Sequence, residues 1–289
     1  MTPDGGRVIL LPHPGRERLP DGNLLCNWPP QRSHHRRKFM HVAGSWRDLH
    51  TDRGSGSLEI WTEYEAPTRA MPLRGPPGTA KHLHRIVTKV GAPTLNTDPW
   101  IFHPGFVWTT CRHPRADDVR TGDLVLFGSS VDGHWVLDTI FAVDRRLEHP
   151  SNIQFAPEYN ALVLLPLQGH QEQVRPFIGK PFHRITSPFS FVPCTLSDNG
   201  NQPFKRLDIT QLLKTLQKIS DNCIPSRRNA QALVCCNPRK GLTKFWNDLL
   251  SEVESQGLLL GTSFKHPGVE ITGPSNIPQC CSSHTFNKC

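Results

Sequence analysis

Two apolar segments separated by a short glycine-containing connection constrain the fold of this chain more than any other feature. Gly122 and Asp123 form a turn signal, and residues 124–127 (LVLF) then have the composition of a buried strand. The stretch 128–133 interrupts the apolar run, and residues 135–143 (WVLDTIFAV) resume it. This pattern predicts two adjacent antiparallel strands joined by a hairpin-like connection.

Three other segments have strand character. Residues 57–65 (SLEIWTEYE) alternate between apolar and polar side chains, which is the two-residue period of a half-buried strand. The apolar run 161–167 and the short segment 189–192 are also expected to be strands. Short strands with frequent turns favour a bent, mixed or antiparallel sheet with a barrel-like closure over a doubly wound layer.

Helices are expected near the C-terminal end of the sequence. The chain contains 22 glycines and 27 prolines, which predicts many turns and few long helices, and residues 66–80 are expected to form a loop. Apolar residues recur at helical spacing in 208–219 and in 243–256, and Gly257 follows the second segment. We therefore predict an α+β fold in which two C-terminal helices pack on a barrel-like sheet.

The sequence divides into three parts. Residues 1–56 are expected to form an irregular basic N-terminal arm, 57–265 a single α+β domain, and 266–289 a flexible tail. No apolar run approaches the ~18 residues of a membrane span, and the N-terminus lacks a signal-peptide pattern. The nine cysteines show no C-x-x-C spacing, so we expect a reduced cytoplasmic protein without membrane contact.

Charge favours a polyanionic partner. With 33 Lys and Arg against 25 Asp and Glu, the formal net charge is +8, which suits RNA or DNA without requiring either. Arg36, Arg37 and Lys38 are the candidates for phosphate contacts, and Trp61 and Trp108 are the candidates for stacking on a base. The alternative for the basic run is a solvated charged surface, and for each tryptophan it is ordinary packing.

Three acids are candidates for catalysis. Asp138 lies inside an otherwise apolar strand, so its carboxylate must be paired, exposed at a rim, or held in a pocket with a raised pKa. Asp98 and Glu63 are the other candidates, as acid or base. Arginines that could pair with Asp138 are Arg112, Arg145 and Arg146. The spacing of His and Cys residues supports no metal site, and no cofactor is expected.

The segment that begins with Gly122 and Asp123 and continues through residues 135–143 resembles a PUA-like barrel of the ASCH or EVE type. The resemblance covers about 25 of the 289 residues. It implies a protein that binds RNA or modified bases in a cleft beside the barrel, often through an aromatic residue. Only Gly122 and Asp123 are carried over, as turn residues without assigned chemistry. Other segments are similar to uncharacterised bacterial proteins: HRRKF (35–39), W-x-E-x-E (61–65), NTDP (96–99) and FSFVP (189–193).

Three functional hypotheses follow from the sequence. The first is binding of nucleic acid or a nucleotide-like ligand in a cleft, with basic residues on the phosphates and a tryptophan on the base. The alternative is an enzyme that acts on a nucleotide or another small substrate through acidic residues in the same cleft. The third is an interaction module whose charge serves only solubility.

Overall fold

A computed structural model describes most of the chain. The described residues are 6–12, 37–50, 52–74, 80–91, 96–109, 119–148, 156–167, 175–197, 205–219, 233–234 and 241–272.

The first sheet is built around the hairpin that the sequence predicts. It has seven strands, in the order β13 (Leu233–Val234), β1 (Val8–Pro12), β8 (Leu124–Val131), β9 (His134–Arg146), β10 (Phe177–Gly179) and β7 (Val107–Trp108), and β12 (Leu207–Asp208) also pairs with β9. Strands β8 and β9 are antiparallel, whereas β1 is parallel to β8, so the sheet is mixed.

Asp123 fastens β1 to the start of β8. Its carboxylate accepts hydrogen bonds from the backbone N–H groups of Arg7 and Arg120, both at 2.9 Å, and from Arg7 Nη2 at 2.6 Å. Gly122, just before it, has φ of +92°, a conformation that favours glycine. The turn predicted at these two residues is therefore present. The Asp123 carboxylate also accepts hydrogen bonds from backbone N–H groups of two segments, one at Arg7 and one at Arg120.

The second sheet contains the long hairpin of β2 and β3. It has six strands, in the order β14 (Leu259–Lys265), β11 (Val192–Leu196), β3 (Arg53–Glu63), β2 (Arg37–Arg47), β5 (His82–Ile86) and β4 (Thr68–Pro72), and β14 also pairs with β2. A bridge between Ile140 and Phe191 connects it to β9. Two further strands, β6 (Lys89–Val90) and β15 (Glu270–Ile271), form a small separate sheet.

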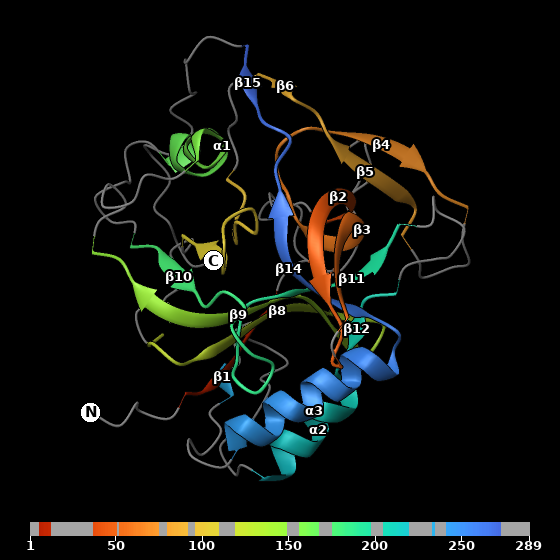
Figure 1. Ribbon diagram of the computed structural model, residues 1–289, viewed down its shortest axis with the longest axis vertical. Helices are drawn as coiled ribbons and strands as arrows, with labels where there is room; N and C mark the ends of the chain where they lie inside the picture. The colour runs from red at the N-terminus through yellow and green to blue at the C-terminus, as the bar shows by residue number, and fades with distance from the viewer. Residues whose placement is uncertain are drawn as a thin grey trace.

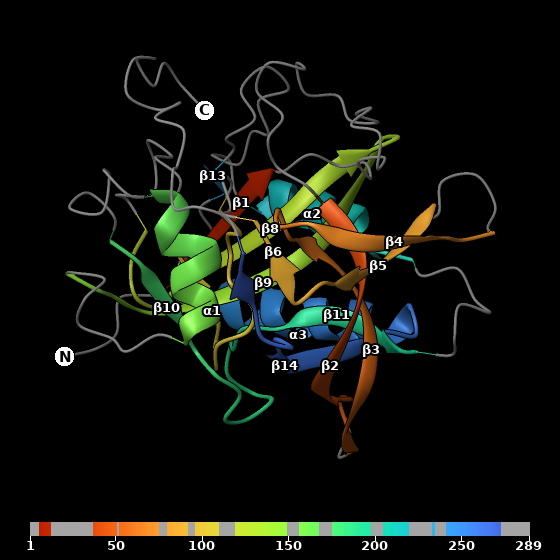
Figure 2. The ribbon, with the colours of Figure 1, turned by 90° about the horizontal axis from the view of Figure 1, so that it is seen from above.

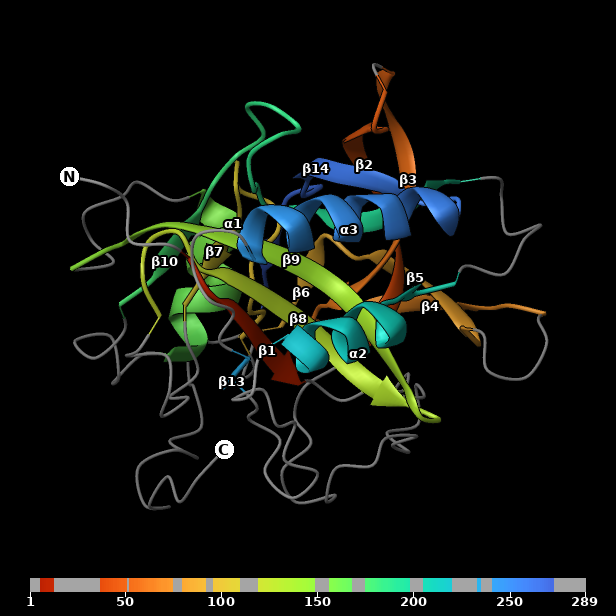
Figure 3. The same cartoon turned by 90° about the horizontal axis from the view of Figure 1, so that it is seen from below.

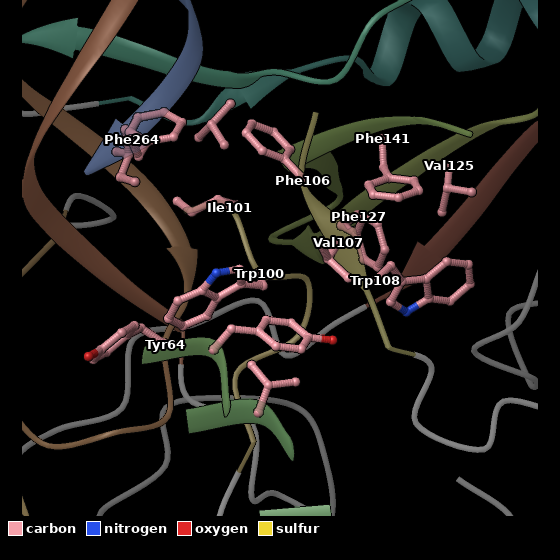
Figure 4. Close-up of a cluster of buried hydrophobic side chains, with 14 of the residues drawn as sticks. Tyr64, Trp100, Ile101, Phe106, Val107, Trp108, Val125, Phe127, Phe141 and Phe264 are labelled. Atoms are coloured by element: carbon pink, nitrogen blue, oxygen red, sulfur yellow. The ribbon is translucent and has the colours of Figure 1, made fainter. Parts of the chain in front are cut away.

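Alternate residues of the strands enter two separate cores. Leu58 and Ile60 of β3 belong to the first core, with Trp108, Phe127 and other aromatic side chains that Figure 4 shows in close-up. Trp61 of β3 belongs to the second core. Because successive side chains of a strand point to opposite faces, both faces of the central strands are buried. A strand that reads as half-buried from its sequence is therefore buried on both sides.

Helices cover the two cores from different sides. The short helix α1 (Pro157–Tyr159), the π-helical turn η4 (Asn160–Leu164) and the 3₁₀ turn η5 (Leu165–Leu167) contribute to the first core. Helices α2 (Thr210–Ile219) and α3 (Gly241–Ser255) pack on the second core. Figure 1 shows α1 and the pair α2 and α3 with the strands between them, and Figure 3 shows α2 and α3 lying across β8 and β9.

The fold is α+β and dominated by mixed sheets, with helices at both predicted C-terminal positions. The described strands form no single closed barrel. Residues 161–167, predicted as a strand, are helical because Pro157 begins a helix and a short apolar run fits either structure. The expected loop at 66–80 contains the edge strand β4.

The predicted irregular arm, 1–56, contains the strands β1 and β2. Basic residues at the start of β2 obscured its strand pattern, because their partners are distant in the sequence: Arg37 pairs with Glu63, and Lys38 donates to the carbonyl of Ala66. The start of the predicted tail also has a fixed position, since His266 contacts the first core and β15 follows it. Residues 273–289 lie outside the described residues.

Candidate functional site

The first residue of β2 and the last residue of β3 form a buried ion pair. Arg37 and Glu63 are directly opposite in the antiparallel register. Arg37 Nη2 lies 3.3 Å from Glu63 Oε2, and the side chains are 0% and 1% exposed. Residues two apart on a strand share a face, so this pair lies beside the cross-strand pair Phe39 and Trp61. One face of the sheet therefore presents an ion pair next to two aromatic rings.

Asp138 reaches this ion pair from the other sheet. The β8–β9 register passes from Phe127 opposite Thr139 to Gly128 opposite Leu137, so Asp138 is an extra residue without a partner in β8. Such a bulge redirects a side chain and is common beside active sites. Asp138 Oδ2 lies 3.5 Å from Arg37 Nε. The guanidinium of Arg37 therefore lies between carboxylates from two sheets.

Arg206 completes the group and covers Trp61. It precedes β12, which pairs with β9. Its Nη2 atom donates hydrogen bonds to Asp138 Oδ1 at 2.5 Å and to Ser129 Oγ at 3.0 Å. The guanidinium carbon of Arg206 lies 4.9 Å from the ring centroid of Trp61, within the range of a cation–π interaction. We call Arg37, Glu63, Asp138 and Arg206 the charge cluster.

The charge cluster leaves some hydrogen-bonding capacity unused. None of the three guanidinium nitrogens of Arg37 makes a hydrogen bond with good geometry among the described residues. The indole N–H of Trp61 and Oδ2 of Asp138 have no hydrogen-bond partner there either. Buried polar groups are nearly always bonded, so neighbouring exceptions indicate water or a ligand at the same place.

Burial controls the electrostatics of the charge cluster. Burial raises the pKa of Asp138, and the positive charges of Arg206 and Arg37 offset part of that shift. Burial likewise lowers the pKa of Arg206, against the opposing effect of Asp138. With two arginines and two carboxylates, the formal charges of the cluster balance. Removal of one member would leave an uncompensated buried charge, which proteins tolerate poorly.

The structure brings four of the predicted site residues together. Glu63 and Asp138, proposed as catalytic acids, both contact Arg37, which was proposed as a phosphate contact. Trp61, proposed as a stacking residue, lies beside them on the same face of β3. Arg37, Trp61 and Glu63 lie close together because of the register between β2 and β3. The bulge of β9 directs Asp138 toward these three residues.

Other predicted residues lie elsewhere. Lys38 is buried and not on an exposed arm: its Nζ atom donates to the carbonyl of Ala66 at 2.6 Å, on the opposite face of β2 from Arg37. Trp108 is a core residue, with its ring 5.3 Å from that of Phe177. Arg36 lies outside the described residues.

Asp98, the third predicted acid, has a local structural role. Its Oδ1 atom accepts hydrogen bonds from the backbone N–H of Thr109 at 2.7 Å and from the Thr109 hydroxyl at 3.2 Å. The side chain is buried in the part of the first core that contains Tyr159, whose hydroxyl lies 3.4 Å from the same threonine hydroxyl. Asp98 therefore holds the segment before β7 and does not join the charge cluster.

Sequence reasoning did not identify Arg206. The arginines considered as partners of Asp138 were nearby in the sequence, whereas Arg206 is 68 positions away. Of those nearby candidates, Arg145 is exposed and pairs with Asp144 at 3.4 Å, and Arg112 lies outside the described residues. An acid inside an apolar strand does signal that a buried cation is needed, but only the fold shows which one.

The charge cluster has no metal-site chemistry. Within the described part of the chain, no group of three or more His, Cys, Asp or Glu side chains could hold a metal ion. The two carboxylates of the cluster are already engaged by guanidinium groups. The two guanidinium groups beside these carboxylates therefore disfavour a further cation at this place.

Comparisons with protein-family models, curated proteins and solved structures gave no match. Among the helices in the described ranges, none is sufficiently long and apolar to cross a membrane.

Proposed function

We propose that this protein binds a nucleotide-like ligand, with its base beside Trp61 and its polar edge toward the charge cluster. The observation that carries the proposal is the arrangement of Arg37 between Glu63 and Asp138, beside an indole whose N–H has no hydrogen-bond partner in the described structure. Nucleobases present donors and acceptors on one edge and a flat π surface. Carboxylates accept from amino groups, and a guanidinium donates to ring nitrogens and carbonyls.

The charge balance of the cluster favours a base over a phosphate. The two arginines are matched by Glu63 and Asp138, so the cluster has no excess positive charge to attract a phosphate group. A neutral polar heterocycle needs no excess positive charge for binding. It also stacks on the indole, and such stacking contributes about 1–3 kcal/mol per base in single-strand binding proteins. In this account Arg206 moves off the Trp61 ring when the base enters.

We propose that the sheets form an incomplete barrel of the PUA-like kind, with the ligand beside it. The support is that β14 pairs with β11 and also with β2, and that the hairpin of β8 and β9 begins at the Gly122 turn.

Binding can be measured by isothermal titration calorimetry with nucleosides, nucleoside monophosphates and a short single-stranded RNA. Trp61→Phe keeps an aromatic ring but removes the indole N–H and part of the stacking area, so we expect at least a several-fold loss of affinity. Trp108→Phe is the matched control, because Trp108 is 4% exposed and Trp61 5% exposed. Equal affinities for the two variants, with folding confirmed by circular dichroism, would contradict the base site.

An enzyme that acts on a nucleotide is the second candidate. The observation that favours it is that Glu63 and Asp138 approach one guanidinium, which places two carboxyl groups at one site. The test is prolonged incubation with nucleosides and nucleotides, followed by chromatography of the products. Product formation that Asp138→Asn abolishes, with folding of the variant confirmed by circular dichroism, would support the enzyme; the absence of any product from the unaltered protein would contradict it.

A further inference from the structure

Two arginines face each other across the edge of the six-stranded sheet. Arg69 of β4 and Arg85 of β5 are directly opposite in the antiparallel register, and Arg85 is also level with His41 of β2. Both arginines are exposed. We call these three residues the basic row. Figures 1 and 2 show β4 and β5 on the side of the molecule opposite to α1.

The basic row is electrostatically unfavourable in the free protein. Like charges directly opposite on neighbouring strands destabilise a sheet. Within the described ranges, neither Arg69 nor Arg85 forms an ion pair with a carboxylate. An anion between the two guanidinium groups would remove the repulsion, and phosphate is the anion that such planar donors bind well.

His41 adds polarity to the row without adding full charge. Burial and the positive charge of Arg85 lower its pKa. Its ring Nε2 contacts the hydroxyl of Ser57, and Glu59 is opposite it on β3. The carboxylate of Glu59 is buried and accepts from Ser197 Oγ at 3.3 Å. Arg69 and Arg85 are the exposed charged side chains of the basic row.

The basic row lies on the same face of the sheet as Trp61. The adjacent row on this face contains Met71, Leu83, Phe39 and Trp61. Each of the first three is two residues along its strand from a member of the basic row, and Trp61 is two residues from Glu59. Two residues along a strand span about 7 Å, and neighbouring strands are about 5 Å apart. Arg85 on β5 is thus about 12 Å from Trp61 on β3, a distance consistent with phosphates that flank a bound base.

We propose that Arg69 and Arg85 bind backbone phosphates of a single-stranded nucleic acid whose base is held beside Trp61. This inference rests on the proposed function and narrows its ligand from nucleotides in general to a polynucleotide. The row runs to β4, which is the last strand of the sheet. A nucleic-acid chain with phosphates on Arg85 and Arg69 would continue past this edge of the sheet, whereas a single nucleotide would end beside Trp61.

The test measures salt dependence. Fluorescence anisotropy of a labelled eight-nucleotide single-stranded RNA, and of the matching DNA, is recorded between about 50 and 200 mM salt. The slope of log affinity against log salt is about 0.7 per neutralised phosphate for single strands, so Arg69→Gln with Arg85→Gln should reduce its magnitude by about 1.4. Arg120→Gln with Arg175→Gln is the matched control, since both arginines are exposed and lie outside the six-stranded sheet.

Two further titrations separate the possible failures. Nucleosides lack phosphate, so the Arg69 and Arg85 double variant should bind them with unchanged affinity, whereas Trp61→Phe should weaken nucleosides and oligonucleotides alike. Equal salt slopes for the two double variants would overturn the basic row and leave the base site intact. A loss of nucleoside triphosphate affinity as large as the loss for the oligonucleotide would overturn the assignment to a polynucleotide. An unchanged affinity of Trp61→Phe would contradict the base site and the placement of the bound base beside Trp61, while the salt slopes would still test the phosphate contacts of Arg69 and Arg85.

Discussion

Arg37 and Asp138 belong to different sheets, yet Nε of Arg37 lies 3.5 Å from Oδ2 of Asp138, with both side chains fully buried. The contact joins the long hairpin of β2 and β3 to the bulge of β9. It also places one guanidinium between carboxylates of two sheets, because Arg37 faces Glu63 as well. The candidate site is thus built at the junction of the sheets.

Removal of Arg37 should destabilise the protein strongly. Arg37→Met keeps much of the side-chain volume but removes the guanidinium that pairs with Glu63 and with Asp138. Breaking buried ion pairs of this kind costs about 3–5 kcal/mol. Urea denaturation followed by circular dichroism gives the free energy of unfolding. Arg145→Met is the control: its ion pair with Asp144 is exposed, so the expected change is within about 0.5 kcal/mol. Similar losses for the two variants would refute the role of the cluster in stability.

Asp123 should be another site of large destabilisation. Asp123→Ala removes the acceptor for two backbone N–H groups and the partner of the Arg7 guanidinium, so we expect a loss of about 2–4 kcal/mol in the free energy of unfolding. Asp248→Ala is the comparison, since Asp248 forms a helical surface pair with Lys244. Its expected loss, about 0.5 kcal/mol, is measurable in the same denaturation experiment. A smaller loss at Asp123 than at Asp248 would contradict this account.

Acid should destabilise the protein through His266. Burial lowers the pKa of His266 from 6.5 to about 4, against the opposing charge of Glu158. The ring is stacked with Trp100 and Tyr64, and its Nε2 lies 3.0 Å from the Tyr64 hydroxyl. The unfolded chain binds this proton at a higher pH than the folded chain does. Stability from this group is therefore complete above pH 6.5 and falls as the pH decreases toward 4.

The expected loss is on the order of 2 kcal/mol between neutral pH and pH 4, allowing for the partial exposure of the ring. Urea midpoints across this range measure it. His266→Phe keeps a ring in the stack and should flatten that part of the pH profile. An unaltered profile in His266→Phe would show that this imidazole does not cause the effect.

Gly105 should not tolerate a side chain. Its φ is +76°, and a Cβ there would lie 2.1 Å from the carbonyl oxygen of Gly179, which is backbone and cannot move aside. Gly105→Ala should therefore lower the thermal midpoint by several degrees, since misfit backbone substitutions cost more than about 1 kcal/mol. At Gly56 a Cβ would meet nothing within 4 Å, so Gly56→Ala should leave the midpoint nearly unchanged. Equal midpoints would contradict the close approach of Gly105 and Gly179.

Local patterns predicted the elements whose partners are near in the sequence. The hairpin of β8 and β9 follows from two apolar runs and a turn, and α3 follows from helical spacing with Gly257 at φ of +70° after its end. The strand β2 was not predicted, because Arg37 and Lys38 belong to a basic sequence that is typical of a solvent-exposed segment. Their burial depends on Glu63 and the carbonyl of Ala66, which only the folded chain brings to them.

The candidate site was predicted in its residue types but not in its assembly. An acid inside an apolar strand, Asp138, and an indole on a polar strand face, Trp61, both indicated a special environment. Their proximity depends on the β9 bulge and on the approach of two sheets, neither of which has a local signal. Arg206 lies before a two-residue strand, and no pattern around it distinguishes it from a surface arginine.

The most direct test of the base site is an NMR titration of the indole N–H signals of the ¹⁵N-labelled protein with a nucleoside monophosphate. The Trp61 indole signal is assigned by its absence in Trp61→Phe, and the Trp108 signal by its absence in Trp108→Phe. Because the indole N–H of Trp61 has no hydrogen-bond partner among the described residues, we predict a large, saturable shift of its signal, while the signal of Trp108 stays in place. A Trp61 signal that does not move at saturating ligand would contradict the account.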